Sequence, residues 1–331
     1  SLMALIAPVQ VFVPVVMPGA GVTGFRCEVT DEPVGQAECL LCAQRGATGC
    51  AMIPAYIEQI SKDQRPHDFS QQLSRKHGAD FGISVTEVLY CPRKLRLKMQ
   101  HGWTEKPSDF YARWAGTATH AGLEAYSGPG VAEERMIVVF DFRGQKVLLS
   151  GKPDLVEYAP SLGWTITDYK RTGWPPRQSY SYACPACNEI ILEGVTDRRG
   201  LKFYCPTCDA DLRRRQVHQI THAPQARDSH AMQINLLALL LLRNEEQYTS
   251  LLEAQHGVVT AGNTDRFSGQ VVYLGTQGIV RCPVAVDLEA ARDLLRQRLD
   301  VLLSPDLPAR LPEAQWECKY CPVAEHCEAA A

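Results

Sequence analysis

The sequence lacks a hydrophobic run that could span a membrane. Residues 2–18 carry no charged side chain and are largely apolar, but Pro8, Pro14 and Pro18 interrupt them. A spanning helix needs about 20 consecutive apolar residues, and a secretory signal begins with basic residues, which this stretch does not have. The sequence therefore predicts a soluble, cytoplasmic protein with no membrane partner, and we interpret residues 2–18 as an extended strand or arm.

The sequence also lacks a strong excess of charge, low-complexity tracts and internal repeats other than one repeated cysteine pair. Its 331 residues are 45% hydrophobic and 21% charged, and the formal net charge is -3. This composition supports a packed core rather than disorder, and the length suits one large domain or two ordinary ones. A nucleic-acid-binding protein of this charge must cluster its basic residues; clusters lie at 93–98, 198–199 and 213–215.

Thirteen cysteines in a chain without a recognisable export signal indicate metal sites rather than disulfides. Four of them form two Cys-x2-Cys pairs, Cys184 with Cys187 and Cys205 with Cys208, with two short expected strands between the pairs. This spacing is typical of a zinc ribbon, in which four thiolates surround one zinc ion. We expect a structural ribbon over residues 179–215, because so small a segment folds only with its metal.

Three further cysteines near the C-terminus, Cys318, Cys321 and Cys327, need a fourth ligand. Cys91 is the best candidate, and it would join residues at the two ends of the main domain. Four thiolates can hold zinc or an iron–sulfur cluster, and spacing alone does not separate the two. The alternative is a C-terminal zinc knuckle with Cys91 merely buried.

A cysteine-rich extension is expected over residues 1–75. Its quartet Cys27, Cys39, Cys42 and Cys50 is spaced irregularly, so a second zinc site and free thiols in a small core both stay open. Residues 61–75 are polar and charged and indicate a linker or an exposed helix.

Two acidic signatures lie close together, Gly-Lys-Pro-Asp ending at Asp154 and Asp-Tyr-Lys from Asp168 to Lys170. The neighbouring apolar residues 147–149 and 164–167 are expected to be strands, and their pairing through a turn at 159–163 would bring all three side chains to one face. Two carboxylates can hold a hard divalent cation, and a lysine can assist a water or offset charge on a phosphate. This is the chemistry of phosphodiester cleavage; a turn and a solvated ion pair are the alternative.

Two expected helices add further candidates. In the first, at 111–126, Gly116, His120 and Glu124 share a face, and His120 can give a nitrogen ligand to a metal. In the second, at 229–243, Gln233 needs a hydrogen-bond partner, which a DNA phosphate, a metal-bound water or a backbone carbonyl could supply. Strands are also expected near 258–260 and 270–286, and a helix at 287–303. Helices and strands mixed around one sheet predict an α/β fold.

The order of these motifs resembles the RecB-type exonucleases of the PD-(D/E)xK nuclease class. The residues that carry the likeness are 116–124, 151–154, 168–170 and Gln233. The sequences around Cys91 and around residues 318–327 are similar to the CRISPR-associated iron–sulfur exonucleases of the fourth Cas family. AddB-type helicase-nucleases have the same layout of one cysteine followed by three. The resemblance covers about residues 80–328 without the ribbon.

The resemblance implies a restriction-endonuclease-like domain over residues 76–331, with a central mixed sheet flanked by helices. It implies a [4Fe–4S] cluster on Cys91, Cys318, Cys321 and Cys327. It implies manganese or magnesium on His120, Asp154 and Asp168 with the Tyr169 carbonyl. Lys170 would assist the attacking water and Gln233 would position the phosphate, so the expected catalytic residues are Asp154, Asp168, Lys170 and Gln233.

The expected function is therefore that of a metal-dependent DNA exonuclease acting on single strands or overhangs. In CRISPR adaptation it would process prespacers, with DNA as substrate and an integrase or helicase as partner. The chain departs from the family at Leu237, where a tyrosine is usual, and in having the ribbon and the N-terminal extension. These departures keep open a non-catalytic nucleic-acid-binding or scaffolding subunit. A redox-sensing iron–sulfur regulator is a third hypothesis.

Overall fold

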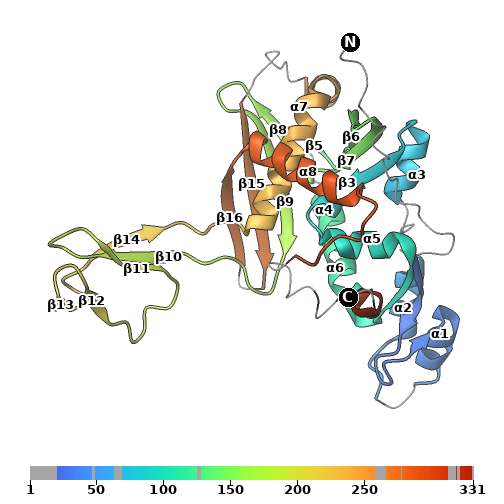
Figure 1. Cartoon of the computed structure of the whole chain (residues 1–331), viewed down its shortest axis with the longest axis horizontal. Helices are drawn as coiled ribbons and strands as arrows, with labels where there is room; N and C mark the ends of the chain where they lie inside the picture. The colour runs from blue at the N-terminus through green and yellow to red at the C-terminus, as the bar shows by residue number, and fades with distance from the viewer. Residues whose placement is uncertain are drawn as a thin grey trace, which may run out of the picture.

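The computed structural model of the chain describes residues 21–46, 49–62, 69–124, 128–257, 266–276, 278–311, 318 and 321–329 (Figure 1). The expected arm at 2–18 and the expected strand at 258–260 lie outside these residues. Helices and strands alternate along the chain, so the expected α/β class is confirmed. In the described part of the chain, no helix combines the length and the hydropathy that a membrane crossing requires.

A five-stranded mixed sheet forms the centre of the molecule. Its strands are, in spatial order, β16 (Gly278–Ala285), β15 (Phe267–Gly275), β9 (Gly163–Arg171), β8 (Leu155–Ala159) and β5 (Gly130–Ala132). The middle strand β9 runs parallel to β15 and antiparallel to β8. Trp164 and Ile166 of β9 are fully buried. Because alternate side chains share a face, Asp168 and Lys170 continue the buried row toward the end of the strand.

A second sheet contains β3 (Phe81–Ser84), β7 (Gln145–Gly151) and β6 (Met136–Phe142). Residues 147–149 belong to β7, so the expected pairing of this run with 164–167 is wrong. The strand that pairs with β9 is β8, which begins directly after Asp154. Pro153 separates β7 from β8 because it has no N–H to donate to a ladder. Asp154 therefore lies where the chain passes from one sheet to the other.

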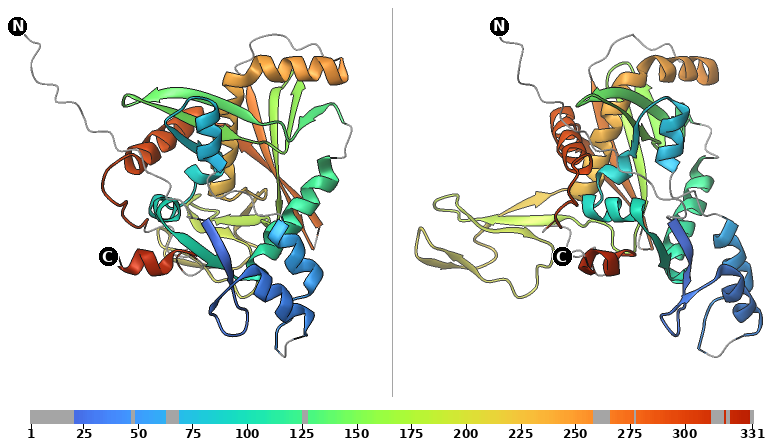
Figure 2. Two further views of the ribbon diagram at one scale, coloured as in Figure 1. Left: turned by 90° about the vertical axis from the view of Figure 1, so that its right-hand side faces the viewer. Right: turned by 45° about the vertical axis from the view of Figure 1, so that its right-hand side comes forward.

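The helix α7 (Asp228–His256) covers the buried face of the central sheet, and α8 (Leu288–Leu302) packs beside it (Figure 2). The apolar stretch of α7 enters the main core with Ile234, Leu237 and Leu241. The helix is longer than the expected 229–243, and its one irregular residue, Asn244, donates a side-chain hydrogen bond to the Leu240 carbonyl at 2.8 Å.

Further helices belong to the body of the molecule. These helices are α3 (Phe69–Lys76), α4 (Val85–Val88), α5 (Pro92–Gln100), α6 (Pro107–Glu124) and α10 (Ala324–Ala329). Gln71 of α3 exchanges two hydrogen bonds with the backbone of Gly82 in β3, and Ser70 donates to Glu87 at 2.6 Å. The α3 part of the segment expected as a linker or exposed helix is thus packed on the second sheet.

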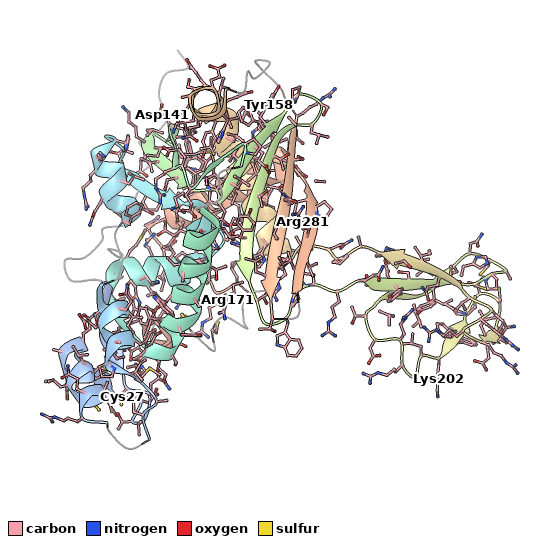
Figure 3. The ribbon with its side chains drawn as sticks, turned by 180° about the vertical axis from the view of Figure 1, so that it is seen from behind. Cys27, Asp141, Tyr158, Arg171, Lys202 and Arg281 are labelled. Atoms are coloured by element: carbon pink, nitrogen blue, oxygen red, sulfur yellow. The ribbon has the colours of Figure 1, made fainter. Side chains whose placement is uncertain are left out.

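Two smaller lobes are attached to this body. The N-terminal lobe holds β1 (Gly21–Arg26), β2 (Pro33–Val34), α1 (Gln36–Gln44) and α2 (Pro54–Lys62), with β4 (Gly102–Glu105) joining its sheet. The second lobe holds β10 (Ser179–Ala183), β11 (Ile190–Val195), β12 (Phe203–Cys205), β13 (Ala210–Leu212) and β14 (His218–His222). This second lobe projects from the body as an arm, with Lys202 far from the central sheet (Figure 3).

Candidate metal and active sites

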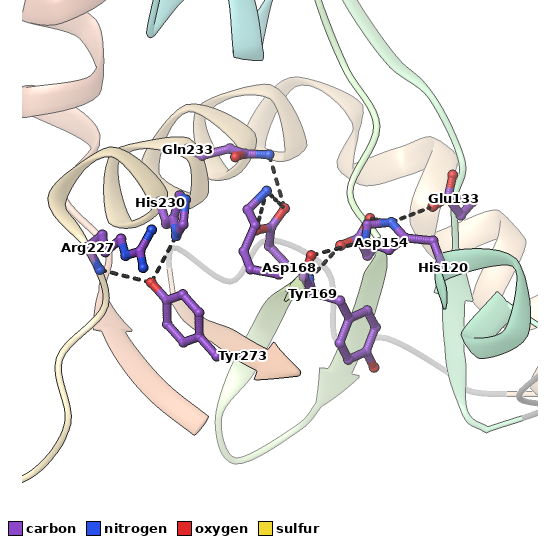
Figure 4. Close-up of polar contacts among 10 residues, drawn as sticks. His120, Glu133, Asp154, Asp168, Tyr169, Arg227, His230, Gln233 and Tyr273 are labelled. Carbon is purple, nitrogen blue, oxygen red and sulfur yellow. Dashed lines mark hydrogen bonds and ion pairs between the residues drawn. The ribbon is translucent and has the colours of Figure 1, made fainter. Parts of the chain in front are cut away.

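Asp168 is the buried centre of the candidate active site. Its side chain is 3% exposed. Lys170 donates to Oδ1 from Nζ at 3.1 Å and its Nζ also lies 2.8 Å from Oδ2; Gln233 Nε2 donates to Oδ1 at 3.0 Å (Figure 4). Among the described residues Oδ2 accepts no hydrogen bond, although it takes part in the ion pair with Lys170. A buried carboxylate oxygen of this kind can also coordinate a cation.

His120, Asp154 and Glu133 form a second group at the edge of the sheet. His120 Nδ1 lies 3.1 Å from Asp154 Oδ1 and 3.8 Å from Glu133 Oε1, and its Nε2 lies 3.1 Å from the Tyr169 carbonyl oxygen. One ligand atom from each of the three side chains lies within 4.8 Å of the other two. The Tyr169 N–H donates to Asp154 Oδ2 at 2.5 Å, which ties this group to β9. A cavity of about 10 Å³, the size of one water, lies among them.

The expected metal ligands are thus brought to one site, with a difference in arrangement. His120 and Asp154 are in contact, whereas the carboxylate of Asp168 lies outside the tight group and faces the same groove. Sequence reasoning missed Glu133, which occupies the third place in that group. Its backbone has a φ of 55°, a left-handed conformation that is uncommon for glutamate. Lys152 forms an ion pair with its carboxylate.

Burial and hydrogen bonding set the proton affinities of two residues at the site. Burial raises the pKa of Asp168 to about 6, against the opposing effect of the Lys170 ammonium. The hydrogen bond that His120 donates to Asp154 raises the pKa of His120, although burial acts in the other direction. Carboxylates and an imidazole are ligands that manganese and magnesium accept. The donor set therefore fits a hard divalent cation.

A hydrogen-bonded trio lies on the other side of Lys170, and sequence reasoning missed it as well. The Tyr273 hydroxyl lies 2.9 Å from His230 Nδ1 and accepts from the Arg227 backbone N–H at 2.9 Å (Figure 4). Burial, with the nearby charges of Lys170 and Arg227, lowers the pKa of His230 to about 4. This imidazole is therefore neutral at pH 7. His230 lies one helical turn before Gln233, but nothing in the sequence pairs it with a tyrosine 43 residues away.

The four ribbon cysteines form a site of the expected kind. The Sγ atoms of Cys184 and Cys208 are 3.8 Å apart, and those of Cys187 and Cys205 are 3.5 Å apart. Thiolates at 2.3 Å from a tetrahedral zinc would be about 3.8 Å apart. Backbone N–H groups of residues 186 and 187 lower the pKa of Cys184 to about 7, which favours its thiolate form. All four sulfurs lie within 4.8 Å of one another, so this group can hold a metal ion.

The one-plus-three cysteine set also meets in space. Cys91, at the start of α5, lines a cavity of about 20 Å³ together with Cys318, Cys321 and Cys327. Arg93 donates from Nε to Cys327 Sγ at 3.2 Å, which ties α5 to the C-terminal segment. Among the described residues, these four sulfurs do not form a group within 4.8 Å as the ribbon sulfurs do. The remaining candidate quartet lies in the N-terminal lobe.

Comparison with known proteins adds little at this level of similarity. No protein-family model matches the chain, and no curated protein sequence matches it. A crystal structure of a protein called SSO0001 is similar to it with a TM-score of 0.42 and 15% sequence identity, over 84% of this chain and 94% of that chain.

Proposed function

We propose that the chain is a metal-dependent deoxyribonuclease of the PD-(D/E)xK class that acts on single strands or overhangs. The observation that carries the proposal is the meeting of His120, Asp154, Asp168, Lys170 and Gln233 around one groove. These side chains come from α6, β9, α7 and the β7–β8 connection, which only the fold brings together. The set combines cation ligands with an ammonium and an amide, as phosphodiester hydrolysis requires.

Each residue of this set has a role that follows from its contacts. His120, Asp154 and Asp168 would hold the cation, with Glu133 near it. A bound manganese or magnesium ion would lower the pKa of a water and offset charge on the phosphate. The Lys170 ammonium, beside Asp168, offsets negative charge that grows on the phosphate. Gln233 fixes the orientation of Asp168 through its hydrogen bond to Oδ1.

The groove suits a single nucleic-acid strand. It has a volume of about 620 Å³, and its wall includes Phe69, Tyr90, Lys98 and Arg135 in addition to the acidic residues. The Phe69 ring is 36% exposed, and the Arg135 guanidinium lies 4.9 Å from its centre. Bases stack on aromatic rings and phosphates pair with cations, so such a wall fits an unpaired strand. Phe69 belongs to α3, which begins within the extension expected over residues 1–75.

The cysteine set at the chain ends would hold a [4Fe–4S] cluster. Its four sulfurs line one cavity, and four thiolates are the ligand set of such a cluster. The resemblance of the flanking sequences to the fourth Cas family supports the same assignment. It also supports prespacer processing in CRISPR adaptation as the biological role, with the integrase as partner. The ribbon would hold zinc.

The experiment that tests the proposal compares Asp168→Asn with wild type on end-labelled single-stranded and overhang-bearing DNA in the presence of manganese. Asp141→Asn, an exposed carboxylate on β6, is the matched control. We expect cleavage by wild type and by the control, and a loss of about 100-fold or more in Asp168→Asn. Equal cleavage by Asp168→Asn and wild type would remove Asp168 from the mechanism and with it this proposal.

A non-catalytic, DNA-binding or scaffolding subunit is the second candidate. The observation in its favour is the projecting ribbon, whose Tyr204 and Ile190 are about half exposed. Leu237, in the place of the family's tyrosine, is buried in the core and offers no polar group. This function predicts that the fully metallated wild-type protein binds DNA without cutting it.

A further inference from the structure

The four cysteines of the N-terminal lobe lie on or beside three neighbouring elements, because α1 packs against both α2 and β1. Cys27 directly follows β1, Cys39 and Cys42 lie one turn apart on α1, and Cys50 lies shortly before α2. Residues three apart on a helix are neighbours on its surface. Figure 3 shows Cys27 in this lobe, on the opposite side of the molecule from the ribbon.

Packing in the lobe leaves α1 without support of its own. None of the residues of α1 is buried, although Cys39, Leu40 and Ala43 touch the small cluster of Phe25, Ile57 and Ile60. Isolated helices of this length are not stable in water. Segments of about 40 residues usually need a metal or a disulfide to supplement so small a core. An additional link between α1 and its neighbours would stabilise the lobe.

We propose that Cys27, Cys39, Cys42 and Cys50 bind one zinc ion that holds α1 against β1 and α2. Four thiolates are the ligand set of structural zinc, and a Cys-x2-Cys pair on a helix supplies two of them from one element. Cys27 begins a tight turn in which its carbonyl accepts from the Asp31 N–H at 3.1 Å, and Asp31 has a φ of 62°. This turn would present Cys27 as the first ligand, next to α1.

Metal binding takes the ligands as thiolates, so a bound cation would release the protons of the four thiols. Among the described residues the lobe sulfurs are not as tightly grouped as the ribbon sulfurs, so binding would draw them together.

Zinc in this lobe would also help to hold α6, and with it His120, in place. The importance of this effect for activity rests on the proposed function. The lobe contacts the start of α6, the helix that carries His120. Phe25 packs edge-on against Phe110 with ring centres 5.7 Å apart, Tyr56 donates to the Pro107 carbonyl at 2.7 Å, and Glu28 accepts from the Ser108 N–H at 2.6 Å. A loosened lobe would leave these contacts weaker.

The test is the metal content of the purified full-length protein, with zinc and iron measured separately. We expect about two zinc ions per chain in wild type, one in Cys42→Ser and one in the ribbon variant Cys208→Ser. Cys42→His keeps a possible ligand and should retain both zinc ions, which separates loss of the site from loss of the fold. One zinc ion in wild type, or two in Cys42→Ser, would overturn the proposal. These counts do not depend on cleavage, so the nuclease proposal stands or falls separately.

Discussion

At the residue scale, Asp168 and His120 both hold protons more tightly than free side chains do. The pKa of Asp168 is raised to about 6 by burial, and that of His120 is raised by its hydrogen bond to Asp154. For an acid with a raised pKa, the contribution to stability is present below the pKa of the unfolded chain and is lost as the pH rises through 6. The metal-free protein is therefore expected to lose stability from this group between about pH 4 and pH 6.

The same shifts predict how manganese binding depends on pH. A cation must displace the protons from His120, whose pKa is raised, and from Asp168, whose pKa is about 6, so its affinity should fall as the pH is lowered toward and through 6. We expect the Kd for manganese, measured by calorimetry, to rise by about tenfold per pH unit below that point for each proton displaced. A Kd that is constant from about pH 5 to pH 8 would mean that these groups are not ligands.

The residues that the sequence predicted at the site are those with distinctive local motifs. Asp154, Asp168 and Lys170 lie in short sequence motifs next to strands. His120 lies on a helix face that the spacing of four residues in the sequence indicates. Glu133 and Tyr273 have no such pattern, because their place in the site depends on contacts with residues distant in the chain. Only the folded chain identifies them.

At the scale of elements, the docking of α3 on β3 depends on the absence of a side chain at Gly82. A Cβ there would lie 2.0 Å from the Ser70 carbonyl oxygen and 3.0 Å from Ser74 Cβ. Since the nearest obstacle is backbone, we expect Gly82→Ala to lower the free energy of unfolding by about 3 kcal/mol. Gly122→Ala is the control, because Gly122 is an exposed residue of α6 with nothing within 4 Å of an added Cβ.

The control should behave in the opposite direction. Alanine in an exposed helix stabilises by about 0.5 to 1 kcal/mol relative to glycine. Urea unfolding of both variants measures the difference. If Gly82→Ala is as stable as wild type, α3 does not pack on β3 as described.

The elements themselves were predicted unevenly. The positions of β9, α7 and α8 were predicted well from their apolar residues, because buried positions recur at the spacing of a strand or a helix in these segments. The predicted partner of β9 was wrong. Pro153 separates β7 from β8, and hydrophobicity alone does not tell which of these two strands pairs with β9. The packing of α3 rests on polar contacts of Gln71 and Ser70, which no hydrophobic pattern reports.

At the scale of the whole molecule, two arginines of α5 hold the C-terminal part of the chain. Arg96 is 1% exposed and donates to the carbonyls of Leu302, Ser304 and Pro305 at 2.5, 2.9 and 3.2 Å. Arg93 donates to the carbonyls of Pro308 and Cys327, each at 3.1 Å. These contacts join residues more than 200 positions apart, so they close the domain around the cysteine set.

We expect Arg96→Met to lower the free energy of unfolding by about 3 kcal/mol or more, because it leaves three carbonyls, of which that of Leu302 is buried, without their charged donor. Arg310→Met is the matched control, since Arg310 is exposed and, among the described residues, donates one hydrogen bond, to the Cys327 carbonyl at 3.2 Å. Its effect should be below about 1 kcal/mol. Equal unfolding midpoints in urea for the two variants would contradict this account of the closure.

The large-scale arrangement was predicted only where cysteines mark it. Spacing indicated the ribbon and the meeting of Cys91 with the C-terminal cysteines. The structure groups the four ribbon sulfurs closely and brings Cys91 to one cavity with the C-terminal cysteines. No hydrophobic pattern in the sequence predicts that the ribbon projects from the body or that the N-terminal lobe contacts α6. Both features depend on contacts between parts that are distant in the chain.

The most direct test of the nuclease proposal is the cleavage rate of Lys170→Met. Lys170 contacts Asp168 and faces the groove, so its loss should reduce the chemical step while the groove still binds DNA. Single-turnover cleavage of end-labelled single-stranded DNA with manganese should fall by about 100-fold or more in the variant, with DNA affinity by fluorescence anisotropy close to wild type. Cleavage by Lys170→Met at the wild-type rate, or none by metal-loaded wild type, would contradict the proposal.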